Sequence, residues 1–129
     1  MSFAPEPRDI QGFLSGGVNT SPSSNQILAT MVIAQPGQVR TVVICANSAT
    51  LVRVAPNSPI TVDLHINGVS TWTNPADRPT VPIGTPAFTP VAGRPNKRAV
   101  RPGDVLTLVV ITSATNVGVA ATAVIEYPD

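Results

Sequence analysis

The stretch ITVDLHINGVSTW, residues 60–72, decides the fold that the sequence predicts. Its first residues alternate between apolar and polar side chains, which is the period of a strand with one face on a core. The apolar face holds Ile60, Val62, Leu64 and Ile66, and the face expected to be exposed holds Thr61, Asp63, His65 and Asn67. Asn67-Gly68 favours positive φ and predicts a type I′ turn, which folds residues 69–72 back as a second strand.

Proline and glycine, which interrupt helices, recur along the whole chain. The 129 residues include 14 prolines and 9 glycines, and no run of about twelve residues carries a helical apolar stripe. The length is that of one domain. The sequence therefore predicts an all-β protein, a single jelly-roll-like antiparallel β-sandwich with an extended N-terminal arm.

The expected arm is residues 1–25, where Pro, Gly, Ser and Asn are too frequent for a packed element. Two roles remain open for it: a frayed terminus, or a segment that docks Phe3, or Ile10 and Phe13, on a neighbour. Residues 26–129 then form the sandwich domain.

Two apolar runs, residues 26–34 and 38–46, flank Pro36-Gly37 and are predicted to be hairpin partners. A third short strand is expected at residues 49–54. Both faces are apolar over most of each run, so the second face should be covered by the arm, a loop or another subunit. Charged residues are only 12% of the chain, against about a quarter in typical proteins, which also favours self-association.

Residues 73–95 carry six prolines and no sustained alternation. We expect a surface excursion with short strands near 80–83 and 87–91. It is either a rigid loop that closes one end of the sandwich or an extended segment that lies along a partner.

A basic cluster follows, with four of the eight positive side chains: Arg94, Lys97, Arg98 and Arg101. Such a cluster can be a solvated loop, a dock for an acidic protein surface, or a contact to nucleic acid. The net charge of +1 makes nucleic acid the least favoured partner. The turn at residues 101–104 then starts a buried strand at 105–112, and a last strand of small residues is expected at 117–127.

The sequence contains no recognisable catalytic motif, so we expect no enzyme, no catalytic residue, no cofactor and no metal. Asp63 and His65 share one strand face and would supply only two metal ligands, which favours a structural role for them. The lone Cys45 is interpreted as a buried thiol. No export signal or bilayer-spanning segment is visible, which predicts synthesis in the cytoplasm and no membrane partner.

A carbohydrate-binding module is an alternative, because such sandwiches stack sugars on aromatic side chains. A single Trp72 at a loop entry is more typical of a core plug than of a sugar platform. The candidates for partner contact are Phe3, Ile10, Phe13, Trp72, Arg78, Arg94, Lys97, Arg98 and Arg101.

The Pro/Gly-rich arm, the small Val/Thr/Ala-rich sandwich, the Pro-rich excursion and strand starts such as Pro102-Gly103-Asp104 resemble the small β-sandwich decoration (cement) proteins of tailed bacteriophage capsids. That resemblance implies a virion structural protein on the capsid exterior, made in the host cytoplasm. Its partners would be the major capsid protein and further copies of itself in a homotrimer. A subunit of a phage tail or head fibre is the alternative within the same class.

Overall fold

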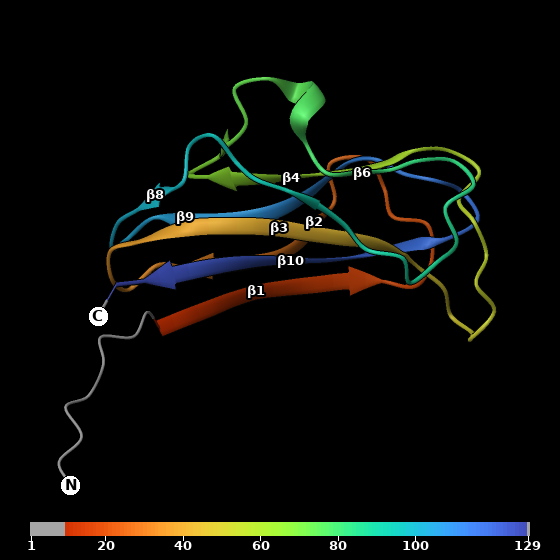
Figure 1. Ribbon diagram of the computed structural model, residues 1–129, viewed down its shortest axis with the longest axis horizontal. Coiled ribbons are helices and arrows are strands. Elements are labelled where there is room, and N and C mark those ends of the chain that lie inside the picture. Colours follow the sequence, from red (N-terminus) through yellow and green to blue (C-terminus); the bar gives the residue numbers. More distant parts are fainter. Residues whose placement is uncertain (1–9, 129) are drawn as a thin grey trace, which may run out of the picture.

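Two antiparallel sheets of five strands each pack face to face in the computed structural model, which describes residues 10–128 (Figure 1). Sheet A contains, in spatial order, β1 (Ile10–Val18), β10 (Gly118–Tyr127), β3 (Gly37–Asn47) and β7 (Val91–Gly93), with β8 (Ala99–Val100) also paired to β3. Sheet B contains β2 (Ile27–Val32), β9 (Val105–Thr112), β4 (Ile60–Ile66) and β5 (Val69–Ser70), with β6 (Thr80–Val81) also paired to β4.

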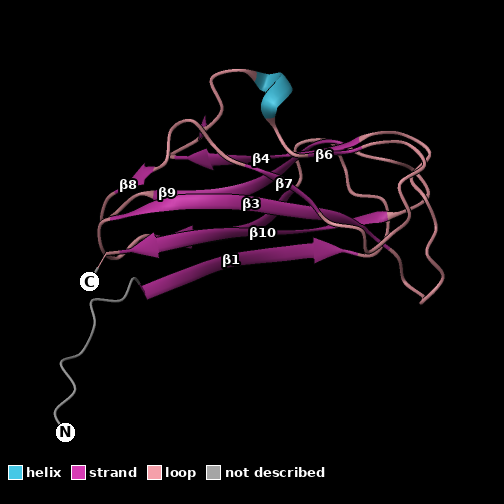
Figure 2. Ribbon diagram, viewed as in Figure 1, coloured by secondary structure: helices cyan, strands magenta, loops and turns pink. Residues whose placement is uncertain are grey.

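The short 3-10 turn η1 (Pro75–Asp77) is the only helical segment within residues 10–128 (Figure 2). Asn74 caps it, since the Asn74 side chain accepts a hydrogen bond from the amide of Ala76. None of the described residues belongs to a helix with the length and apolar character required to cross a membrane.

The chain crosses between the two sheets at six of the nine connections between successive strands. Strands β1, β2, β3 and β4 alternate between sheets A and B, and the connections that stay within one sheet are β4–β5, β5–β6 and β7–β8. The resulting orders, β1-β10-β3-β7 and β2-β9-β4-β5, are those of a jelly roll. The predicted all-β sandwich is therefore confirmed.

The hairpin at residues 60–72 forms around the expected turn. Asn67 and Gly68 have φ values of 53° and 82°, as a type I′ turn requires. The return strand β5 is only Val69–Ser70, shorter than predicted. Ile60, Val62 and Leu64 are buried in the core as expected, but Asp63 on the opposite face is also fully buried, so the prediction of an exposed face is wrong at that position.

The predicted pairing of residues 26–34 with 38–46 is wrong. Strand β2 pairs with β9 in sheet B, whereas β3 pairs with β10 in sheet A. Strands β2 and β3 each bury one apolar face in the shared core. A connection that passes from one sheet to the other allows both strands to do so. Residues 49–54 are bends in a loop and form no strand.

The prediction of an arm over residues 1–25 is wrong for residues 10–18, which form strand β1 and pair with β10 along their whole length. The glycines of this segment serve close packing here. A Cβ on Gly12 would lie 2.8 Å from the ring of Tyr127, and one on Gly16 would collide with the carbonyl group of Leu28. The rest of the expected arm that precedes β1, including Phe3, lies outside the described residues.

The later strand predictions hold in part. Strand β6 falls within the expected 80–83, but the next strand is at 91–93 instead of 87–91, because Phe88 adopts a positive φ of 68° that interrupts extended backbone. Strands β9 and β10 match the segments expected at 105–112 and 117–127. Gly103, in the turn before β9, has a positive φ of 91°.

Candidate functional site

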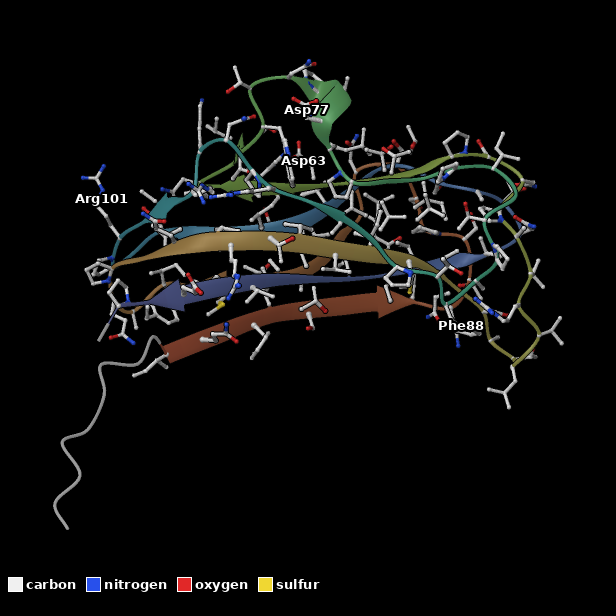
Figure 3. All side chains as sticks on the ribbon, viewed as in Figure 1. Asp63, Asp77, Phe88 and Arg101 are labelled. Carbon is white, nitrogen blue, oxygen red and sulfur yellow. The ribbon has the colours of Figure 1, made fainter. Side chains whose placement is uncertain are left out.

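A buried carboxylate lies on the outer face of sheet B. Asp63 is 0% exposed, and its Oδ2 lies 3.0 Å from Nη2 of Arg78 and 3.3 Å from Nε2 of His65. Its Oδ1 accepts a hydrogen bond of 3.0 Å from the hydroxyl of Ser70. Figure 3 shows Asp63 on β4, beneath the loop that carries Asp77. We call Asp63, His65, Ser70 and Arg78 the Asp63 cluster.

The Asp63 cluster fastens a loop to a strand. Ser70 and His65 each contact the carboxylate, an arrangement that differs from a nucleophilic relay, in which the histidine stands between the other two groups. The guanidinium of Arg78 fills the position in which a cation would bind Asp63. Throughout residues 10–128, no three potential metal-ligating acidic, His or Cys side chains gather in one place. The cluster therefore anchors the Pro-rich loop on β4.

Two predicted partner contacts are corrected by their burial. Arg78 has a side chain only 18% exposed and is engaged with Asp63, so it is not a free surface cation. Trp72 is 3% exposed and belongs to the hydrophobic core, so it offers neither a partner contact nor a sugar platform. The sequence pattern could not show that Arg78 covers Asp63, because only the path of the loop between them brings the two side chains together.

The basic cluster divides between two surface hollows. Arg94 and Arg98 line a hollow of about 560 Å³ beside β3, together with Arg40. Lys97 and Arg101 line a separate hollow of about 270 Å³ beside the β4–β5 turn. Sequence analysis missed Arg40, although a lone arginine inside an apolar strand run was a visible signal.

The carboxylate of Asp104 closes the turn before β9. It accepts hydrogen bonds from the backbone amide of Arg101 at 2.8 Å and from the side chain of Asn67 at 2.9 Å. These two bonds, the Arg101 amide first, lower the pKa of Asp104 below its ordinary value. The turn before β9 is thereby tied to the β4–β5 turn.

The loops at one end of the sandwich carry exposed apolar side chains. Leu51 is 94% exposed, and we define it together with Val52, Val54, Ile83 and Phe88, all also exposed, as the apolar tip. Backbone hydrogen bonds from Ala87 to Val54 and from Phe88 to Ala46 hold these loops together. Figure 3 shows Phe88 and Arg101 at opposite ends of the molecule.

The outer face of sheet A also carries apolar side chains. Phe13 on β1 is 60% exposed and lies opposite Val124 of β10, and the same face continues over Val43 and Cys45 of β3. Ile10, at the start of β1, is also exposed. Cys45 is half-buried on this face and is not a core thiol, and its burial raises the pKa of the thiol despite a backbone hydrogen bond from Phe88 that lowers it.

A comparison of the chain with protein-family models, with curated proteins and with solved structures found no match.

Proposed function

We propose that this protein is a non-enzymatic structural protein of a bacteriophage particle, which binds the outer surface of the capsid as a homotrimer and reinforces or decorates it. The observation that carries this proposal is the exposure of large apolar side chains on two surfaces, the apolar tip and the outer face of sheet A. Exposed apolar patches of this kind mark sites of protein association.

The jelly-roll architecture supports the same proposal, since viral capsid and lectin domains share it. That support is an analogy at the level of the fold and does not identify a partner.

The outer face of sheet A suits contact between identical copies. In an antiparallel sheet with one solvated face, outward side chains are usually polar. Here Val43, Cys45 and Val124, all partly buried, project outward from central strands beside the exposed ring of Phe13 on the edge strand. Polar side chains, such as the hydrogen-bonded Ser15 and Thr122, alternate with them on the same face. The Phe13 ring is 60% exposed, and its burial between copies would favour association by about 1–2 kcal/mol.

The apolar tip suits contact with the shell. Arg53 braces it, since Nε donates to the carbonyl of Ala87 at 3.0 Å and Nη2 donates to the hydroxyl of Thr89 at 2.7 Å. A braced loop loses little conformational entropy when a partner binds it. Leu51 at its end is the side chain with most surface left to bury.

Light scattering on the purified chain tests the self-association. We expect a mass about three times the 13.3 kDa of one chain, and a shift toward the monomer in Phe13→Ser. Gln11→Ser, a polar change on the same face of β1, is the matched control and should leave the mass unchanged. A stable monomer of the unaltered chain at micromolar concentration would contradict the proposal.

Sedimentation of the chain with purified capsids tests the docking surface separately. Leu51→Ser should remain a trimer but lose capsid binding, whereas the neighbouring Thr50→Ser should retain both. Undiminished capsid binding by Leu51→Ser would remove the apolar tip from the contact.

A further inference from the structure

The hollow beside β3 combines a strand irregularity with a fixed loop. It is lined by Gln38, Val39, Arg40, Thr41, Arg94, Arg98 and Glu126, and its volume is about 560 Å³. It lies where β3 begins and β10 ends, at the end of the sandwich opposite the apolar tip (Figure 1).

A β-bulge in β3 forms the floor of this hollow. Val124 of β10 stands opposite Thr41 and the next residue, Ile125, stands opposite Val39, so Arg40 is the extra residue. Val39 and Val42 both remain fully buried, which leaves the side chains of Arg40 and Thr41 together on the outer face. Bulges that re-aim side chains in this way are frequent next to functional sites.

The loop at residues 94–98 forms the wall and is held by hydrogen bonds on both sides. The amide of Val39 donates to the carbonyl of Arg98 at 2.8 Å. On the other side, the amides of Asn96 and Lys97 donate to the carbonyl of Thr71 at 3.1 and 2.9 Å. Arg94 and Arg98 therefore extend from a backbone that is already fixed, which lowers the entropic cost of binding a ligand between them.

The charges around the hollow do not balance. Three guanidinium groups face one carboxylate, that of Glu126, which pairs with Arg40 at 2.9 Å. The side chains of this pair are 58% and 31% exposed, and an ion pair at the surface contributes little to stability. A carboxylate supplied by a partner can therefore replace Glu126 at little cost. The planar fork of arginine binds a carboxylate through two parallel hydrogen bonds.

We propose that this hollow binds an extended acidic segment of a partner protein, with Arg94 and Arg98 holding its carboxylates. Arg40, released from Glu126, provides a third contact. The net charge of the chain, only +1, and the carboxylate in the lining favour a peptide over nucleic acid, which requires a broad basic face. This inference deepens the proposed function by naming the chemistry of one partner contact, and its test needs no particle.

The test is an NMR titration of the full chain at low salt with a synthetic decapeptide of alternating Glu and Gly. The acidic peptide should shift the backbone amides of Arg40, Thr41, Arg94 and Arg98, and a peptide with Gln in place of Glu should not. Arg94→Gln/Arg98→Gln should weaken binding about tenfold or more, because it removes the two guanidinium groups that hold the carboxylates of the peptide. Glu126→Gln, which removes the competing carboxylate, should strengthen it.

The matched control is Lys97→Gln/Arg101→Gln, because it removes the same charge from the same cluster but outside this hollow. It should weaken binding by about twofold at most, the effect of net charge alone. Equal losses of affinity for the acidic peptide in the two double variants would overturn the inference. No binding at about 1 mM peptide would also overturn it. So would tighter binding of a single-stranded oligonucleotide through the same arginines. Absence of capsid binding by the unaltered chain, while it still binds the acidic peptide, would refute the proposed function alone.

Discussion

Removal of Arg78 should destabilise the fold more than removal of its partner Asp63. The carboxylate is fully buried, whereas the guanidinium side chain keeps 18% of its surface exposed. Arg78→Met leaves the carboxylate with only Ser70 and His65, and such a broken buried pair costs about 3–5 kcal/mol. Asp63→Asn leaves a guanidinium that can still reach water, so we expect a cost of about 1–3 kcal/mol.

The double variant Asp63→Asn/Arg78→Met separates the pair from its surroundings. Its cost should fall below the sum of the single variants by about 1–3 kcal/mol, because the second substitution removes a group already left without its partner. Urea unfolding followed by the fluorescence of Trp72, the one tryptophan of the chain, provides the assay, at a single protein concentration so that association affects all variants alike.

Two results would refute this account of the Asp63 cluster. One is an Arg78→Met variant within about 0.5 kcal/mol of the unaltered chain, the range of an ordinary surface substitution. The other is strict additivity in the double variant, which would mean that the two side chains act independently.

Three further predictions concern β1 and the two turns. Gly16→Ala should lower stability by about 1–3 kcal/mol, because the new methyl group meets the backbone carbonyl of Leu28, whereas Ser15→Ala loses only an exposed hydrogen bond; equal melting temperatures would exclude the close approach. Gly68→Val should cost about 1–3 kcal/mol through backbone strain alone, since no atom stands near the new side chain, and Gly68→Asn should be milder; equal unfolding midpoints would argue against the turn. Asp104→Asn should be less stable than the unaltered chain at neutral pH, because the pKa of Asp104 is lower in the folded state than its ordinary value of 3.8. In thermal melts, this difference in stability should vanish as the pH falls through and below 3.8. A difference that does not change with pH would contradict this account.

Local features of the fold could be predicted from the sequence. Asn67 and Gly68 adopt the positive φ that the turn requires. The segments at 105–112 and 117–127 form strands, as their long apolar runs predict. These are consequences of neighbouring residues, which a single sequence contains.

Long-range features could not be predicted in the same way. The partner of β2 is β9, far along the chain, and nothing within residues 26–46 distinguishes that pairing from a local hairpin. The packing role of Gly16 depends on Leu28 in the facing sheet. For this reason, the glycine-rich residues 10–18 were predicted to be part of an arm, whereas they form the edge strand β1.

The candidate sites show the same division. The basic cluster was evident, but its separation into two hollows depends on the bulge at Arg40 and on hydrogen bonds to Thr71. Asp63 and His65 were recognised as neighbours on one strand face. The burial of Asp63 depends on Arg78, which only the path of the Pro-rich loop brings over β4.

The copy number of this chain in purified phage particles, measured by quantitative mass spectrometry against the major shell protein, tests the central claim most directly. The account predicts a fixed ratio of the same order as the shell protein itself, and loss of the chain from particles in the Leu51→Ser variant. A few copies per particle would indicate a fibre subunit instead. Absence from particles, with the protein recovered free as a monomer, would contradict the account.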